Sequence, residues 1–176
     1  MKDSSNWVQC WGMAHAALSL TYFPEAERTY RLVINTAVSG KALRVRLSNK
    51  YGKERVIIGA VTAAPCGAGG SISADAEISK ITFCKEKSLT LYPGQRIISD
   101  PVIFSVSAGE YLCVSVYVKK GALSSGNAIN NASFLFCDGN MTESRPFTHT
   151  DRTRSKVIKT ATGILGINHP LPIALF

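Results

Sequence analysis

The chain has 176 residues, of which 45% are hydrophobic and 18% are charged, so it can fold by burial and is not a disordered, collagen-like or coiled-coil chain. Its 20 Lys and Arg residues outnumber 12 Asp and Glu residues, and the formal charge of +8 would attract a polyanion or an acidic protein surface without identifying either. No apolar run approaches the roughly 18 residues of a membrane span, so we expect a soluble protein with no membrane partner, folded as one domain over residues 1–176.

The first residues do not form a clean export signal. Residues 1–6 are polar, and polar residues such as Gln9 and His15 interrupt the apolar stretch that follows. This start predicts a cytoplasmic protein. Secretion is the alternative, if an export signal once preceded Met1.

Alternation of apolar and polar residues predicts β-strands along most of the chain. The first two, at 29–38 and 42–48, are predicted to form a hairpin through the short link 39–41. Arg44 and Arg46 would share one face of that hairpin, with Arg31 across from them.

Further short strands separated by turn residues are predicted along the rest of the chain. They cover 56–60, 81–83, 89–91, 102–106, 111–118, 134–137 and 156–165. The Gly-rich or polar segments 66–70, 119–131 and 138–155 are predicted loops. Short strands with frequent turns and no alternating helices predict an all-β fold, an antiparallel β-sandwich.

The five cysteines show neither a metal-binding nor a disulfide pattern. Their number is odd, and no two have the close spacing that zinc sites use. Cys84, Cys113 and Cys137 each lie in an apolar run, where a free thiol behaves as a small buried hydrophobe. We therefore expect no metal and no cofactor, with a disulfide or a reactive thiol as the alternative.

The motifs of common hydrolases are absent. The sequence has no Gly-Asp-Ser or Gly-x-Ser-x-Gly nucleophile, and none of its histidines follows an aspartate by three positions as in Asp-x-x-His. His-Glu-x-x-His is also missing, and the glycines at 67–70 lack the lysine of a phosphate-binding loop. We expect no catalytic, cofactor-binding or metal-binding residue, and an unconventional site of Cys10 with His15 is the catalytic alternative.

Five residues are weak candidates for ligand or interdomain contacts: Trp7, Trp11, Arg44, Arg46 and Tyr117. Trp7 and Trp11 could stack on a sugar, although two early tryptophans more often attach a terminus to a core. Tyr117 lies about 20 Å along its strand from Tyr111, too far to grip adjacent bases, so we expect no nucleic-acid partner. A polyanion-binding protein is a further alternative, and its affinity for the polyanion would fall steeply as the salt concentration rises.

Several motifs resemble the N-terminal region of GDSL-type (SGNH) esterases. The more specific ones are Arg44-x-Arg46-Leu47-Ser48-Asn49-x-x-Gly52 and Ser99-Asp100-Pro101-Val102. Weaker matches in the family's order are Trp7-Val8-Gln9-Cys10-Trp11, Tyr30-Arg31-Leu32-Val33, Ile58-Gly59-Ala60, Ile81-Thr82-Phe83, Pro93-Gly94 and Leu112-Cys113-Val114-Ser115-Val116-Tyr117. The resemblance spans residues 7–118.

In that family this region is a β-rich accessory domain, and a separate α/β hydrolase domain carries Gly-Asp-Ser and Asp-x-x-His. The resemblance implies a noncatalytic, jelly-roll-like sandwich that packs beside a C-terminal catalytic domain and shapes access for an acylated carbohydrate or another small ester. The apolar residues 170–176 would then lie at an interdomain linker. A stand-alone carbohydrate-binding module is the alternative function.

Overall fold

The structure is a computed structural model that describes residues 7–12, 16–17, 27–121, 125–126, 132–147 and 162–168. Within these residues the chain forms thirteen strands and no helix, and every strand pair is antiparallel. The predicted all-β, antiparallel sandwich is therefore confirmed, and the jelly-roll connectivity stays a prediction. None of the described segments is a helix long and apolar enough to cross a membrane.

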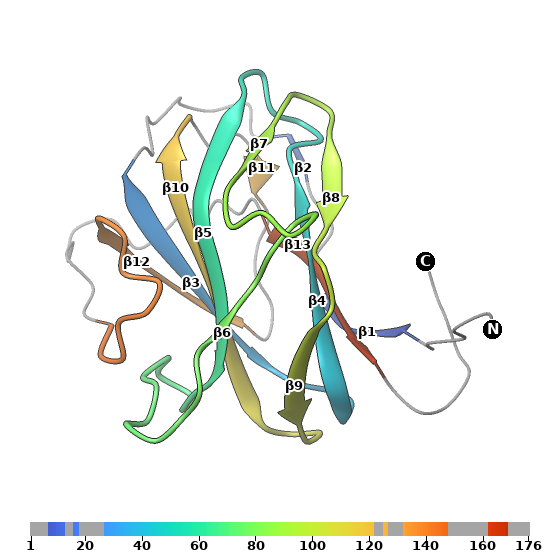
Figure 1. Ribbon diagram of the computed structural model, residues 1–176, viewed down its shortest axis with the longest axis vertical. Helices are drawn as coiled ribbons and strands as arrows, with labels where there is room; N and C mark the ends of the chain where they lie inside the picture. The colour runs from blue at the N-terminus through green and yellow to red at the C-terminus, as the bar shows by residue number, and fades with distance from the viewer. Residues whose placement is uncertain are drawn as a thin grey trace.

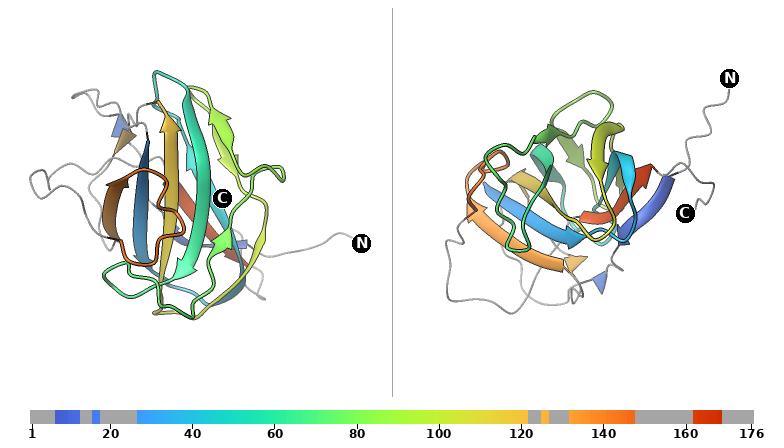
Figure 2. Two further views of the ribbon diagram at one scale, coloured as in Figure 1. Left: turned by 60° about the vertical axis from the view of Figure 1, so that its left-hand side comes forward. Right: turned by 90° about the horizontal axis from the view of Figure 1, so that it is seen from below.

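One sheet has six strands, in the order β12-β3-β10-β5-β6 with β7 also paired to β5. Its strands are β3 (Arg28–Asn35), β5 (Val56–Pro65), β6 (Ser79–Lys80), β7 (Leu89–Leu91), β10 (Tyr111–Lys120) and β12 (Ala132–Asp138). The four longest of these strands lie side by side in the left view of Figure 2.

The other large sheet has five strands, in the order β1-β13-β4-β8 with β9 also paired to β4. Its strands are β1 (Trp7–Gly12), β4 (Gly40–Ser48), β8 (Arg96–Ile98), β9 (Val102–Val106) and β13 (Thr162–Asn168). Two short strands, β2 (Ala16–Ala17) and β11 (Ser125–Gly126), pair with each other. Figure 1 shows the two large sheets as the two layers of the molecule.

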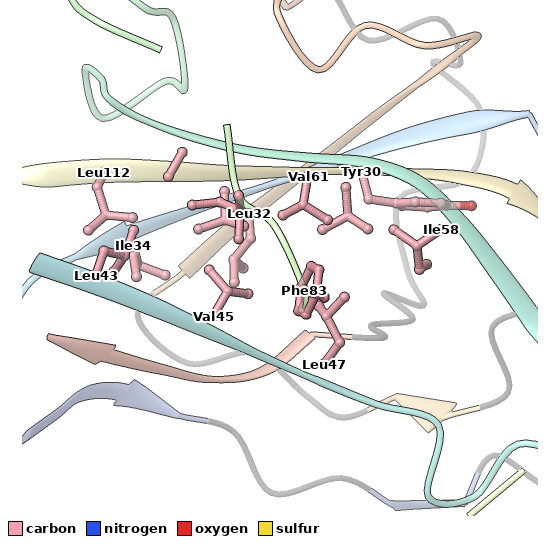
Figure 3. Packing of buried hydrophobic residues seen from close by; sticks show 14 of the residues in the cluster. Tyr30, Leu32, Ile34, Leu43, Val45, Leu47, Ile58, Val61, Phe83 and Leu112 are labelled. Carbon is pink, nitrogen blue, oxygen red and sulfur yellow. The ribbon is translucent and has the colours of Figure 1, made fainter. Parts of the chain in front are cut away.

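The core lies between the two sheets. Alternate residues of β3 and β4 point into it from opposite sides, as Figure 3 shows for Leu32, Ile34, Leu43, Val45 and Leu47. Ile34, Leu43 and Leu47 have no exposed surface. Full burial of such a side chain contributes about 1.5–3 kcal/mol. The period-two pattern that predicted these strands therefore reports the side of each strand that faces the core.

The predicted hairpin between 29–38 and 42–48 is wrong. β3 pairs with β10 and β12, whereas β4 pairs with β13, β8 and β9, so the two strands belong to different sheets. The link between them crosses from one sheet to the other, and Thr36 stabilises the crossing by donating from Oγ1 to the carbonyl of Ser107 at 2.7 Å. Alternation shows which side of a strand is buried but not which strand is its neighbour. Arg31 consequently does not lie beside Arg44 and Arg46.

Smaller differences concern the segment after β6. Residues 81–83 form only an isolated bridge, Phe83 with Glu86, and the next two residues turn. Cys84 and Lys85 have φ angles of 54° and 68°, in the left-handed region. Cys84 is exposed at this turn, so its predicted burial is wrong, whereas burial of Cys113 and Cys137 is confirmed.

The last predicted strand, 156–165, lies only partly within the described residues. β13 begins at Thr162, and residues 156–161 lie outside the described residues. The same holds for most of the predicted loop 119–131 and for 148–155. The described part of the other loop, 139–147, follows β12 and lies in front of the six-stranded sheet in the left view of Figure 2.

Candidate functional site

The outer face of the five-stranded sheet carries exposed aliphatic side chains beside basic ones. Ala42, Arg44 and Arg46 alternate along β4 with residues that enter the core. Ala42 pairs with Ile103 of β9, and Arg46 pairs with Ile98 of β8. Because directly paired residues point to the same side of a sheet, both isoleucines lie on this outer face.

Exposure distinguishes these isoleucines from ordinary sheet residues. Ile103 is 89% exposed and Ile98 is 45% exposed among the described residues. We call the set Trp7, Arg44, Arg46, Ile98 and Ile103 the Arg44 face.

Arg44 stacks on Trp7, although β13 lies between their strands. The guanidinium carbon of Arg44 is 4.7 Å from the centroid of the Trp7 ring. Gly166 of β13 pairs with Arg44 on one side and with Gln9 of β1 on the other. A glycine leaves room for the arginine to extend across its strand to the tryptophan. Such a cation–π contact contributes about 0.5–1 kcal/mol at an exposed site.

The aromatic candidates do not converge on one surface. Trp11 packs against the core, whereas Trp7 contacts Arg44 on the outer side of the same sheet. Tyr117 belongs to β10 of the other sheet and packs over Gly59, where a Cβ would lie 2.7 Å from Cδ1 of the tyrosine. The structure therefore brings Trp7, Arg44 and Arg46 together, and places Trp11 and Tyr117 elsewhere.

Asn49, from the first of the specific motifs, connects three turns of the chain. Its side chain is buried and donates from Nδ2 to the carbonyls of Glu54 at 2.8 Å and Leu91 at 3.1 Å. Its backbone carbonyl accepts from the N–H groups of Gly52 at 3.1 Å and Gly94 at 2.9 Å. A Cβ at Gly52 would lie 1.8 Å from Oδ1 of Asn49, which explains the glycine of this motif. The motif builds a turn rather than a reactive site.

Ser99 and Asp100, from the second specific motif, interrupt the edge strand of the five-stranded sheet. β8 and β9 both pair with β4, and between the two pairings Ser99 Oγ accepts from the N–H of Val45 at 2.9 Å. Asp100 Oδ2 accepts from Thr82 Oγ1 at 2.7 Å and from the N–H of Lys85 at 2.6 Å. The carboxylate thus stabilises the left-handed turn at Cys84 and Lys85.

Asp100 should make stability depend on pH. The hydrogen bonds from Thr82, and next from Lys85, hold the pKa of its carboxyl below the ordinary value. A carboxyl whose pKa is lower in the folded state stabilises the fold above its unfolded pKa of about 3.9, and this contribution is lost as the pH falls through the folded pKa. We expect Asp100→Asn to lower the free energy of unfolding at pH 7 and to lose its effect in acid.

Urea denaturation at pH 7 and in steps down through the acid range tests this expectation. Asp75→Asn is the matched control, because Asp75 is exposed and the structure shows no hydrogen bond to its carboxylate. An Asp100→Asn deficit of the same size at every pH would contradict the assigned role of the charge.

The outer face of the six-stranded sheet is covered by two segments of the chain itself. Arg31, Val33 and Cys113 are buried on this face. Arg31 donates from Nη1 to the carbonyl of Gly70 at 3.0 Å and from Nη2 to that of Ser144 at 2.6 Å. The arginine therefore holds both covering segments, 66–78 and 139–147, against the sheet.

Covalent chemistry at Cys10 has no support. Burial raises the pKa of the Cys10 thiol to about 12, so it is protonated at neutral pH and a poor nucleophile. Its predicted partner His15 lies outside the described residues. Within the described ranges, no three His, Cys, Asp or Glu side chains are arranged to hold a metal ion.

Sequence reasoning missed two features of these faces. Ile98 and Ile103 were not candidates, although the alternation across 102–106 already places Ile103 opposite to the core residues of its strand. The burial of Arg31 under loop segments had no sequence signal, because an arginine in an alternating strand is usually solvated. Comparison with family models and with curated proteins finds no match to this chain.

Proposed function

We propose that this chain is a noncatalytic, jelly-roll-like β-sandwich of a GDSL/SGNH-type esterase, which packs through the Arg44 face against a hydrolase domain. In this role it shapes access to the ester site of that domain, whose substrate is an acylated carbohydrate or another small ester. The observation that carries the proposal is the exposure of Ile103 and Ile98 beside two arginines and a tryptophan.

The composition of this face suits a protein partner. Exposed apolar side chains beside polar ones are found at interaction sites, and Trp and Arg are enriched among the residues that dominate binding energies. Removing the isoleucine side chains from water contributes favourable free energy to binding, whereas the arginines favour carboxylates and carbonyls on the partner surface. We therefore expect the hydrolase domain to offer an apolar patch bordered by acidic groups.

The motif residues support the same role. Asn49, Gly52, Ser99 and Asp100 carry the resemblance to the esterases, and their contacts build turns and the sheet edge next to the Arg44 face. Domains that dock through the same face would share the motif residues that shape this face.

The sugar-binding alternative lacks a comparable observation. Trp7 already stacks with Arg44, and Trp11 packs against the core, so no pair of aromatic rings is available on one surface among these candidates.

Ile103→Glu is expected to weaken docking to the hydrolase domain by about tenfold or more, because it places a charge in the centre of an apolar contact. An antibody to this chain first identifies the natural polypeptide, whose hydrolase domain is then produced separately. Titration calorimetry measures the binding of that domain to the parent chain and to the variant. Hydrogen exchange should also slow in β4, β8 and β9 on association.

Met141→Glu is the matched control, because Met141 is 42% exposed and lies in the segment that covers the other sheet. It should leave docking unchanged. Equal effects of the two variants, or a natural polypeptide with no hydrolase domain, would overturn the proposal.

A further inference from the structure

Two turns and the end of a strand meet at one end of the sandwich. Residues 49–55 link β4 to β5, residues 92–95 link β7 to β8, and β10 ends at Lys120. All three lie at the upper end of the molecule in Figure 1. Leu91 pairs with the first residue of β5 and Lys120 pairs with the second. The ends of β7 and β10 therefore lie on either side of the start of β5.

Backbone contacts hold these segments together. The N–H of Asn49 donates to the carbonyl of Gln95 at 2.8 Å, in addition to the contacts of this asparagine described above. The N–H of Tyr92 donates to Oε1 of Gln95 at 2.9 Å. The carbonyl of Arg55 lies so near the end of β10 that a Cβ at Gly121 would be 2.5 Å from its oxygen. These contacts fix the backbone of this end in the free protein.

Positive charge is concentrated at this end. The segments 49–55, 92–96 and 119–121 contain six exposed basic side chains and one acidic residue, Glu54, so they hold an excess of five positive charges out of the formal +8 of the whole chain. The two ion pairs among the described residues involve other basic side chains, those of Arg28 and Lys80. We call the six basic residues the basic end: Lys50, Lys53, Arg55, Arg96, Lys119 and Lys120.

An exposed aromatic ring lies among these charges. Tyr92 is 53% exposed, in the turn between β7 and β8. Arg55 and Arg96 flank this turn, because Arg55 precedes the residue of β5 that pairs with the end of β7, and Arg96 begins β8. The second tyrosine of these segments, Tyr51, contacts Lys50, whose Nζ lies 4.8 Å from the centroid of the ring. Tyr92 is therefore the more accessible ring for a ligand.

We propose that the basic end binds an acidic polysaccharide, a sugar chain that carries carboxylate or sulfate groups. Arg55 and Arg96 suit bidentate contacts with such anions, and the four lysines supply mobile point charges for groups whose spacing along the chain varies. Tyr92 stacks on the C–H face of one sugar. Most of the affinity comes from charge, which distinguishes this site from a pair of tryptophans that would hold a neutral sugar.

Two other kinds of polyanion fit the basic end less well. Proteins that hold single-stranded nucleic acid stack successive bases on several aromatic rings, whereas Tyr92 is the one ring of these segments that is largely exposed. Proteins that lie on anionic membranes add apolar side chains that enter the lipid. The exposed large aliphatic residues in the described part of the chain, Ile98, Ile103 and Met141, lie outside these segments. An acidic polysaccharide needs only the charges and the ring that this end presents.

Titration calorimetry of the 176-residue protein tests the proposal with two probes, an alginate oligosaccharide that carries carboxylates and a dextran sulfate that carries sulfates. At least one of them should bind, with an affinity that falls steeply as salt is added, and uncharged dextran should not. The double variant Lys53→Gln with Lys120→Gln should weaken binding about tenfold and lower the salt slope by about two, one for each contact removed. Tyr92→Ala should weaken binding about threefold at every salt concentration and leave the slope unchanged.

Lys41→Gln with Lys87→Gln is the matched control, because it removes the same charge from exposed lysines outside the basic end. It should change the affinity by less than about twofold, since distant charges are screened by salt. Circular dichroism confirms that each variant is folded. The proposal is overturned if neither polysaccharide binds more tightly than dextran, or if the two double variants weaken binding equally. It is also overturned if single-stranded DNA or phosphatidylserine vesicles bind more tightly than both polysaccharides.

Discussion

Arg31→Met is expected to lower the free energy of unfolding by about 3 kcal/mol, because the buried carbonyl of Gly70 and the part-buried carbonyl of Ser144 lose their donors, at about 1–3 kcal/mol each. The substitution also removes the contact with the Phe147 ring. Relief of the buried charge offsets part of this loss, since taking an arginine out of water is itself unfavourable. Urea denaturation at pH 7 in the presence of a reductant measures the change.

Arg28→Met is the control for this experiment, because Arg28 belongs to the same strand and is only half-buried. Its guanidinium forms an ion pair with Asp138 at 2.9 Å, and an exposed pair of this kind contributes about 0–1 kcal/mol. In Arg31→Met, limited proteolysis should also cut within 139–147 sooner than in the parent protein. Similar losses of stability in the two variants would mean that Arg31 does not hold the covering segments.

Asn49→Ala is expected to lower the free energy of unfolding by about 2 kcal/mol, because the buried bond to the carbonyl of Leu91 and the part-buried bond to that of Glu54 lose their donor. Glu54 lies in the turn before β5, and Leu91 ends β7 before the turn into β8, so the loss should spread through β8 to the Arg44 face. Hydrogen exchange should quicken in both turns, and thermal unfolding should shift to lower temperature.

Asn35→Ala is the matched control for Asn49→Ala. The Asn35 amide donates to the carbonyl of Gly109 at 2.6 Å but is exposed, so water can replace it and the change should be a few tenths of a kcal/mol. Equal destabilisation by both alanine variants would remove the structural role assigned to the asparagine motif.

The sequence predicts which residues form strands better than it predicts which strands pair with one another. Residues 102–106 and 111–118 alternate because one side of each strand faces the core, and this periodicity is local. The pairing of β3 with β10 and β12 depends on residues far apart in the chain, so the hairpin expected from the short link 39–41 was wrong. Alternation alone would have allowed either arrangement.

The candidate site was predictable in part for the same reason. Arg44 and Arg46 share a face because they are two residues apart, whereas the contact of Arg44 with Trp7 depends on β13, a strand near the other end of the chain. The burial of Arg31 depends on covering segments whose composition is polar and turn-rich. Such segments are indistinguishable in sequence from solvated loops.

The interruption between β8 and β9 has a consequence for how this protein behaves at high concentration. A continuous edge strand offers a row of unpaired backbone groups on which another molecule can add a strand and begin an aggregate. The N–H of Asp100 already donates to the carbonyl of Thr82 at 2.8 Å, and Pro101 has no N–H to offer, so the row is broken near its middle. Asp100 and Pro101 should therefore keep this margin of the sandwich from acting as a template for fibrils.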